Sequence, residues 1–127
     1  MAENRLERKL GFNPKKLKLA ITSTSPKQLS MLGEDLNKFV RARVAGNAHI
    51  NEQTHLKLLN DLERGVVLWA LKNIVTKRRH VDIVIENNSS FCPIITPALA
   101  GHALLTSAEK ERFLLMIEEY KIQMGFK

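Results

Sequence analysis

The sequence contains a single cysteine, Cys92, among its 127 residues. One thiol cannot form an internal disulfide, and unpaired thiols are typical of reducing compartments, so we expect an intracellular, cytoplasmic protein. Cys92 lies between Phe91 and Pro93. These apolar neighbours favour a small buried hydrophobe over a reactive nucleophile.

Long hydrophobic runs and aromatic residues are also scarce. No stretch comes near the roughly 20 apolar residues needed to cross a bilayer, so no membrane partner is expected. Aromatic residues make up 6% of the chain, and four of them, Phe39, Trp69, Phe113 and Tyr120, recur on apolar stripes at helical spacing. Such positions are typical of a core, which disfavours a platform for stacking nucleic-acid bases.

Recognisable catalytic and cofactor motifs are missing. The four histidines show no zinc-ligand spacing with one another or with Cys92, and phosphate-binding glycine loops are absent. Adjacent carboxylates such as Glu118 and Glu119 diverge by about 100° on a helix and do not converge on a substrate. We therefore expect no catalytic residue, no metal ligand and no cofactor, and we favour a role without catalysis.

Basic charge is what the sequence does have, and it is unevenly distributed. The formal net charge is +7. Residues 1–79 hold sixteen Lys and Arg against seven Asp and Glu, whereas residues 80–127 hold four against six. A basic first two thirds beside a mildly acidic remainder suggests a nucleic acid or another polyanion as partner.

The densest basic segment is "TKRRH", with Lys77, Arg78 and Arg79 followed by His80. These residues could contact phosphates, which Arg recognises with forked donors. They could instead close a preceding helix, because each cation near a helix C-terminus contributes about 0.3–1 kcal/mol of stability. Further candidates for nucleic-acid binding are Lys15, Lys16, Lys18, Arg41, Arg43 and Lys72.

The patterning predicts one globular domain over residues 1–127, without internal repeats. The expected class is mainly α (α+β), with about four helices and one short β-hairpin or small sheet at residues 80–96. The hairpin is expected because Val81, Ile83 and Ile85 alternate with other residues. The helices are expected at 3–10, 25–46, 51–77 and 106–124, with Ser25, Asn51 and Thr106 as N-caps, a capping box of Thr106 with Glu109, and Gly125 as the end of the last helix.

The segment at 13–25 is ambiguous. Asn13 and Pro14 resemble a helix start, but Leu17, Leu19 and Ile21 alternate as in a strand, and we favour an extended segment.

The second half of the expected central helix is apolar all round. Leu68, Leu71 and Val75 fall on the side that is polar earlier in that helix. A helix that is apolar on every side is buried on every side. We therefore expect these three residues at or near the interface of a homodimer, the commonest kind of oligomer.

Two functional interpretations follow from these patterns. The first is a small intracellular accessory or regulatory protein without catalytic activity, which binds nucleic acid through phosphate contacts. The alternative is a protein-interaction adaptor, similar to a secretion chaperone, that binds an acidic or helical protein partner through an apolar surface. An enzyme has no supporting constellation of residues.

Overall fold

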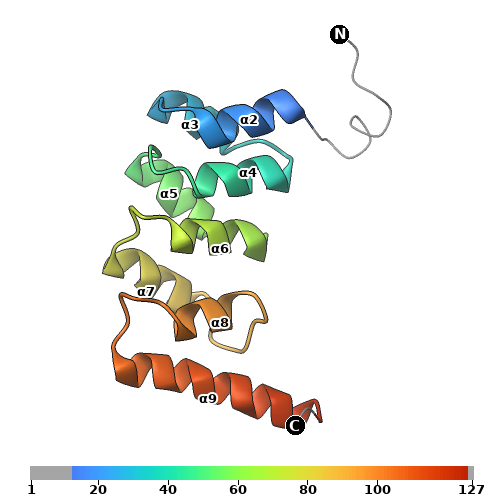
Figure 1. The fold of residues 1–127 in the computed structure, drawn as a ribbon, viewed down its shortest axis with the longest axis vertical. Coiled ribbons are helices and arrows are strands. Elements are labelled where there is room, and N and C mark those ends of the chain that lie inside the picture. Colours follow the sequence, from blue (N-terminus) through green and yellow to red (C-terminus); the bar gives the residue numbers. More distant parts are fainter. Residues whose placement is uncertain (1–12, 126–127) are drawn as a thin grey trace. The chain divides into compact units, whose positions relative to one another are not determined.

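The structure is a computed structural model that describes residues 13–125, and that range holds helices and no strand (Figure 1). The described helices are α2 (Pro14–Thr22), α3 (Pro26–Leu32), α4 (Lys38–Ala45), α5 (Glu52–Leu59), α6 (Arg64–Lys72), α7 (Arg78–Glu86), α8 (Ile95–Ala100) and α9 (Ser107–Gln123). No described helix has the length and apolar character that a membrane span needs. The helix expected at residues 3–10 lies outside the described residues.

The described residues belong to two compact units, one ending at Val75 and one beginning at Thr76, and each is treated by itself. The expectation of a single domain stays a prediction.

The expected β-hairpin or small sheet at residues 80–96 is wrong, and with it the α+β class. Residues 78–86 form α7, whose buried side is made by His80, Val81 and Val84. His80 Nδ1 accepts the backbone N–H of Lys77 at 2.8 Å and so caps the first turn. The alternating apolar residues suit a strand, but the burial of residues at helical spacing outweighs that local preference.

The two long helices expected at 25–46 and 51–77 are each broken by a polar turn. Asp35 Oδ1 accepts the N–H of Asn37, and Asp61 Oδ1 accepts the N–H of Glu63, both at 2.9 Å. Such side-chain hydrogen bonds compete with the helical pattern and stabilise turns. The favoured extended segment at 13–25 is wrong, and the alternative of a helix start is confirmed: residues 14–22 form α2, whose N-terminus is capped by the Asn13 side chain.

A period of 26 residues, which sequence analysis did not find, organises these helices. Helices α3, α5 and α7 begin at residues 26, 52 and 78, and α4 and α6 begin at residues 38 and 64. Within 21–46, the residues that recur identically 26 positions later are Leu32, Asp35, Leu36 and Val40. The repeat is therefore a repeat of caps, turns and buried positions more than of residue identities.

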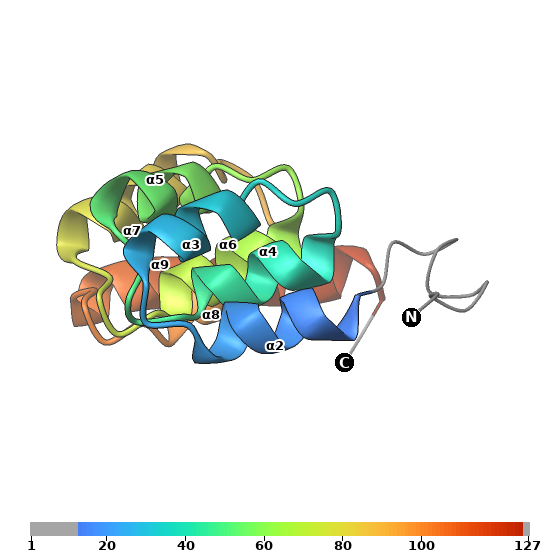
Figure 2. The same ribbon diagram turned by 90° about the horizontal axis from the view of Figure 1, so that it is seen from above.

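In the first unit, α2, α4 and α6 stack as one layer, and α3 and α5 form a second layer beside them (Figures 1 and 2). The core between the layers is aliphatic, with Leu29, Val40, Val44, Leu58 and Val66 all at most 1% exposed. Stacked repeats of this kind bury a continuous core, and each repeat contacts only its neighbours.

Two asparagines one period apart tie successive helices of the first layer together. The Asn47 amide donates to Ala20 O at 3.0 Å and to Ser23 O at 2.9 Å, at the end of α2. The Asn73 amide donates to Ala45 O at 2.7 Å and to Asn47 O at 2.9 Å, at the end of α4. Carbonyls at a helix C-terminus lack partners within the helix, so each asparagine satisfies groups that burial would otherwise leave unpaired.

In the second unit, α8 packs against α9. The capping box expected at the start of α9 is confirmed: Glu109 N–H donates to Thr106 Oγ1 at 3.2 Å, and Thr106 N–H donates to Glu109 Oε1 at 2.9 Å. The Phe91 and Tyr120 rings stack with centroids 4.1 Å apart. The expected end near Gly125 is confirmed too, because Gly125 adopts a φ of +79°, a conformation that glycine reaches without strain.

Candidate ligand-binding face

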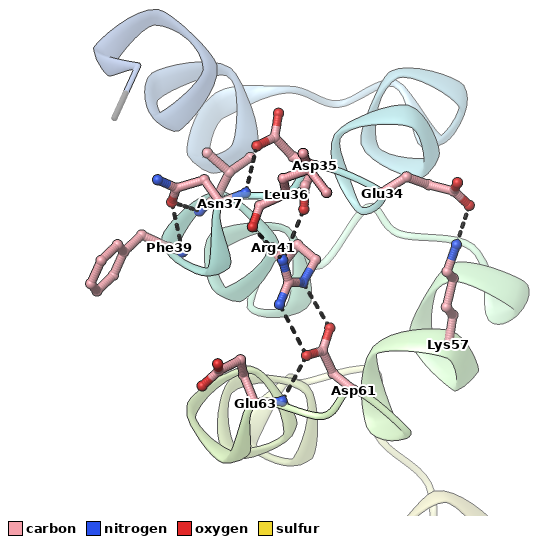
Figure 3. A network of polar contacts seen from close by, with 10 residues as sticks. Glu34, Asp35, Leu36, Asn37, Phe39, Arg41, Lys57, Asp61 and Glu63 are labelled. Carbon is pink, nitrogen blue, oxygen red and sulfur yellow. Dashed lines mark hydrogen bonds and ion pairs between the residues drawn. The ribbon is translucent and has the colours of Figure 1, made fainter. Parts of the chain in front are cut away.

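Arg41, a candidate phosphate contact, is committed to the protein's own groups. Its guanidinium donates to both Asp61 carboxylate oxygens, at 2.8 and 3.2 Å, and to the backbone oxygens of Asp35 and Leu36 at 2.9 and 3.0 Å (Figure 3). The Arg41 and Asp61 side chains are 17% and 11% exposed. We therefore assign Arg41 to holding the α3–α4 turn against the α5–α6 turn.

Lys16 makes the equivalent contact one helix earlier. Its ammonium donates to Asp35 Oδ2 at 2.9 Å, so each aspartate binds a cation from the preceding helix of the layer. Burial raises the pKa of the Asp35 carboxyl, but hydrogen bonds from Lys16 and from the Asn37 N–H outweigh it, and the pKa is lowered. Lys57 pairs with Glu34 nearby. We call the residues Lys16, Glu34, Asp35, Arg41, Lys57 and Asp61 the turn cluster.

The "TKRRH" segment starts a helix instead of ending one. Lys77 is the N-cap of α7, and Arg78 is its first residue. The hypothesis that these cations close a helix C-terminus is therefore wrong. They lie at the N-terminus of α7, which is the positive end of the helix dipole. Lys77 and Arg79 are exposed.

Arg78 is held by two carboxylates of its own unit. Its Nε donates to Asp82 Oδ1 at 3.0 Å and its Nη1 to Glu109 Oε1 at 2.8 Å. These bonds raise the pKa of Arg78, and the bond from Arg78 contributes most to lowering the pKa of Glu109 to about 2. A guanidinium shared between two carboxylates is a weaker candidate for a phosphate contact than a cation with no acidic neighbour.

Cations without such partners lie on the exposed side of α4 and α6. We call this surface the outer face and define it by Lys38, Phe39, Arg43, Trp69 and Lys72. All five are exposed, Phe39 at 58% and Trp69 at 40%. Figure 3 shows Phe39 directed away from the Arg41 guanidinium and the turn cluster. The prediction that Phe39 and Trp69 belong to the core is therefore wrong. That prediction continued each apolar stripe through a turn that separates two helices.

A hollow of about 150 Å³ lies between the two rings of the outer face. It is lined by Lys38, Phe39, Ala42, Glu63, Gly65, Val66 and Trp69. Lys38 Nζ lies 5.6 Å from the Phe39 ring centroid, and Arg43 Cζ lies 4.7 Å from the Trp69 ring centroid. Each ring thus carries a cation within the range of a cation–π contact.

Gly46, at the end of α4, determines where the Trp69 ring lies. A Cβ at Gly46 would come within 2.6 Å of Trp69 Cε3. Contact this close needs a residue without a side chain, so the indole packs directly on the α4 backbone. The Trp69 ring is therefore supported by Gly46, and the residue is still 40% exposed.

The remaining candidates all belong to the first unit. Lys15 and Lys18 are exposed on α2, the helix next to α4 in the same layer, and no ion pair involves them within the described part of the chain. Arg43 and Lys72 lie on the outer face. Sequence reasoning missed Lys38 and the two rings; an alignment at the 26-residue period would have placed Arg43 and Trp69 at equivalent positions on adjacent helices.

The expected dimer interface is only partly accessible. Leu71 is 1% exposed within a single copy of the chain, and Leu68 and Val75 are half-buried. Burial in the protein's own fold accounts for Leu71 without a second copy.

No protein-family model matches this chain, and searches of curated proteins and of solved structures give no significant match.

Proposed function

We propose that the protein is a non-catalytic module that binds nucleic acid through the outer face of α4 and α6. The observation that carries this proposal is the placement of Lys38, Arg43 and Lys72, which are exposed and form no ion pair with any described carboxylate. Exposed Lys and Arg neutralise phosphates and release counterions, which supplies most of the affinity for a nucleic-acid backbone.

The distribution of paired charge supports this choice of surface. In the first unit, the acidic residues Asp35 and Asp61 are bound to Lys16 and Arg41 in the turn cluster. Among the residues that line the hollow on the outer face, Glu63 is acidic and Lys38 is basic. Lys15 and Lys18 are exposed on α2, which packs against α4, and we add them to the proposed contacts. The proposed contacts are thus Lys15, Lys18, Lys38, Arg43 and Lys72.

The experiment is fluorescence anisotropy with labelled duplex and single strands at several salt concentrations. Each phosphate contact contributes a slope of about −0.9 on duplex DNA, or about −0.7 on a single strand, in log affinity against log salt. We expect the double variant Arg43→Gln, Lys72→Gln to bind more weakly. Its salt slope should be flatter by the contribution of up to roughly two phosphate contacts. The matched control is Arg78→Gln with Arg79→Gln, which removes the same charge from the start of α7.

An unchanged slope in the outer-face variant would contradict the proposal. A flattened slope in the α7 variant alone would return the role to Arg78 and Arg79.

A second candidate function, a protein-interaction adaptor, is favoured by one observation. Leu36 and Leu62 are 98% and 93% exposed and lie at the same position of successive repeats. Two apolar side chains held in turns one repeat apart could contact a helical or acidic protein partner. A double substitution of both leucines by Ser is expected to abolish capture of such a partner while leaving nucleic-acid affinity unchanged.

The homodimer expected from the sequence remains a proposal. It now rests on Leu68 and Val75, because Leu71 is buried within a single copy of the chain. Light scattering at tens of micromolar tests it, and a monomer mass would contradict it.

A further inference from the structure

The hollow between Phe39 and Trp69 has the features of a site for a flat ring. Two aromatic side chains line one space of about 150 Å³, together with the small residues Ala42 and Gly65. A Cβ added at Gly65 would meet no atom within 4 Å, so the space in front of that residue is open. Contiguous exposed apolar surface marks a binding site more often than scattered single apolar residues do.

The charges around the hollow favour a ligand that is neutral at its centre and anionic at its edges. Lys38 and Arg43 lie beside the Phe39 and Trp69 rings, at 5.6 and 4.7 Å from their centroids. Glu63, in contrast, belongs to the lining, and its negative charge disfavours an anion inside the hollow. A nucleotide satisfies both conditions, because its base is neutral and its flanking phosphates are negative.

We propose that this hollow is a stacking site for an unpaired base of a single-stranded nucleic acid, with Lys38 and Arg43 contacting the flanking phosphates. The proposal rests on the function proposed above and narrows its substrate class. Bases in a duplex are stacked on one another, whereas single strands can place a base on a protein aromatic ring. The packing of Trp69 on Gly46 leaves the indole fixed in advance, so that ordering the ring costs little on binding.

Trp69 provides a direct test because it is the single tryptophan in the sequence. The full chain is titrated with a thymidine strand of about 12 nucleotides, an abasic strand of the same length and the matched duplex, while the indole emission is recorded. We expect the thymidine strand to quench Trp69 and to bind about 5- to 150-fold more tightly than the abasic strand. The abasic strand should bind with similar salt dependence and little quenching.

Phe39→Ala tests the second ring while keeping the reporter. We expect it to reduce the preference for the thymidine strand over the abasic strand severalfold and to leave the abasic affinity unchanged. The matched control is Leu36→Ala, which removes a 98% exposed apolar side chain from the turn preceding α4. That control should retain the full preference, and circular dichroism should show that both variants are folded.

Three results would overturn the stacking site. Equal affinity for the thymidine and abasic strands, with no quenching of Trp69 and a preserved salt slope, would remove the site and leave the proposed function standing. Failure of every strand to bind would remove both proposals. Quenching by poly-glutamate but by none of the strands would reassign the hollow to an acidic peptide.

Discussion

The turn cluster and the outer face use the same residue types for opposite purposes. In the turn cluster, Arg41 makes four hydrogen bonds to Asp61 and to backbone oxygens, and little of it remains exposed. On the outer face, Arg43 lies over Trp69 and forms no ion pair with any carboxylate that the structure describes. Arg41 and Arg43 are two positions apart in the sequence, yet Arg41 holds the fold and Arg43 does not. Of the two, only Arg43 supports a binding role.

The largest expected effect comes from breaking the turn cluster. Arg41→Ala leaves two carbonyls and the Asp61 carboxylate, whose side chain is 11% exposed, without their partner. We therefore expect the free energy of unfolding to fall by about 3 kcal/mol. The control Lys57→Ala breaks the exposed pair with Glu34 and should cost less than about 1 kcal/mol. Urea denaturation measures both. Equal losses in the two variants would show that Arg41 has no special structural role.

Two glycines near the outer face offer a matched pair of substitutions that tests how Trp69 is held. Gly46→Ala places a methyl group 2.6 Å from Trp69 Cε3, so we expect a loss of about 1–3 kcal/mol and a shift in indole emission. Gly65→Ala meets no neighbour within 4 Å and lies inside α6, so it should stabilise by about 0.5–1 kcal/mol. Thermal melts of both variants check the pair. A stabilising Gly46→Ala would mean that the indole does not depend on that contact.

The smallest effect concerns the exposed ion pair of the second unit. Contact with Arg78 lowers the pKa of Glu109 from its ordinary value of 4.5 to about 2. A lowered pKa stabilises the folded state above pH 4.5, and that contribution disappears as the pH falls from 4.5 towards 2. Glu109→Gln should therefore be slightly less stable than the native protein near pH 6 and equally stable near pH 2. High salt should reduce the difference near pH 6, because both groups are exposed.

The sequence predicted the parts of the fold that depend on local chemistry. The capping residues Ser25, Asn51 and Thr106 were identified correctly, because a short polar side chain before a helix has a local signature. The turns at Asp35 and Asp61 were missed, since the apolar periodicity continues through them in Leu36 and Leu62. The strand assigned to residues 80–96 failed because tertiary burial of Val81 and Val84 outweighs β-branched preference.

The site was predictable only in part. Arg43 and Lys72 were proposed from charge, but charge alone did not separate them from Arg41 and Arg78. Arg41 binds Asp61, 20 residues away, and Arg78 binds Glu109, 31 residues away, as well as Asp82, four residues away. Phe39 and Trp69 were assigned to the core because periodicity does not show where a helix breaks. The 26-residue period carries that information, yet few residues recur identically at that interval, so the repeat is hard to find without the helix boundaries.

The outer face, and not the turn cluster or the start of α7, is the surface that we propose contacts nucleic acid. Amide chemical-shift mapping by nuclear magnetic resonance during titration with a thymidine strand tests it residue by residue. We predict the largest shifts at residues 38–46 and 65–72, together with the Trp69 indole N–H, and small shifts at Asp61, Arg78 and Arg79. Large shifts confined to Arg78 and Arg79, with residues 38–46 and 65–72 unperturbed, would contradict the account.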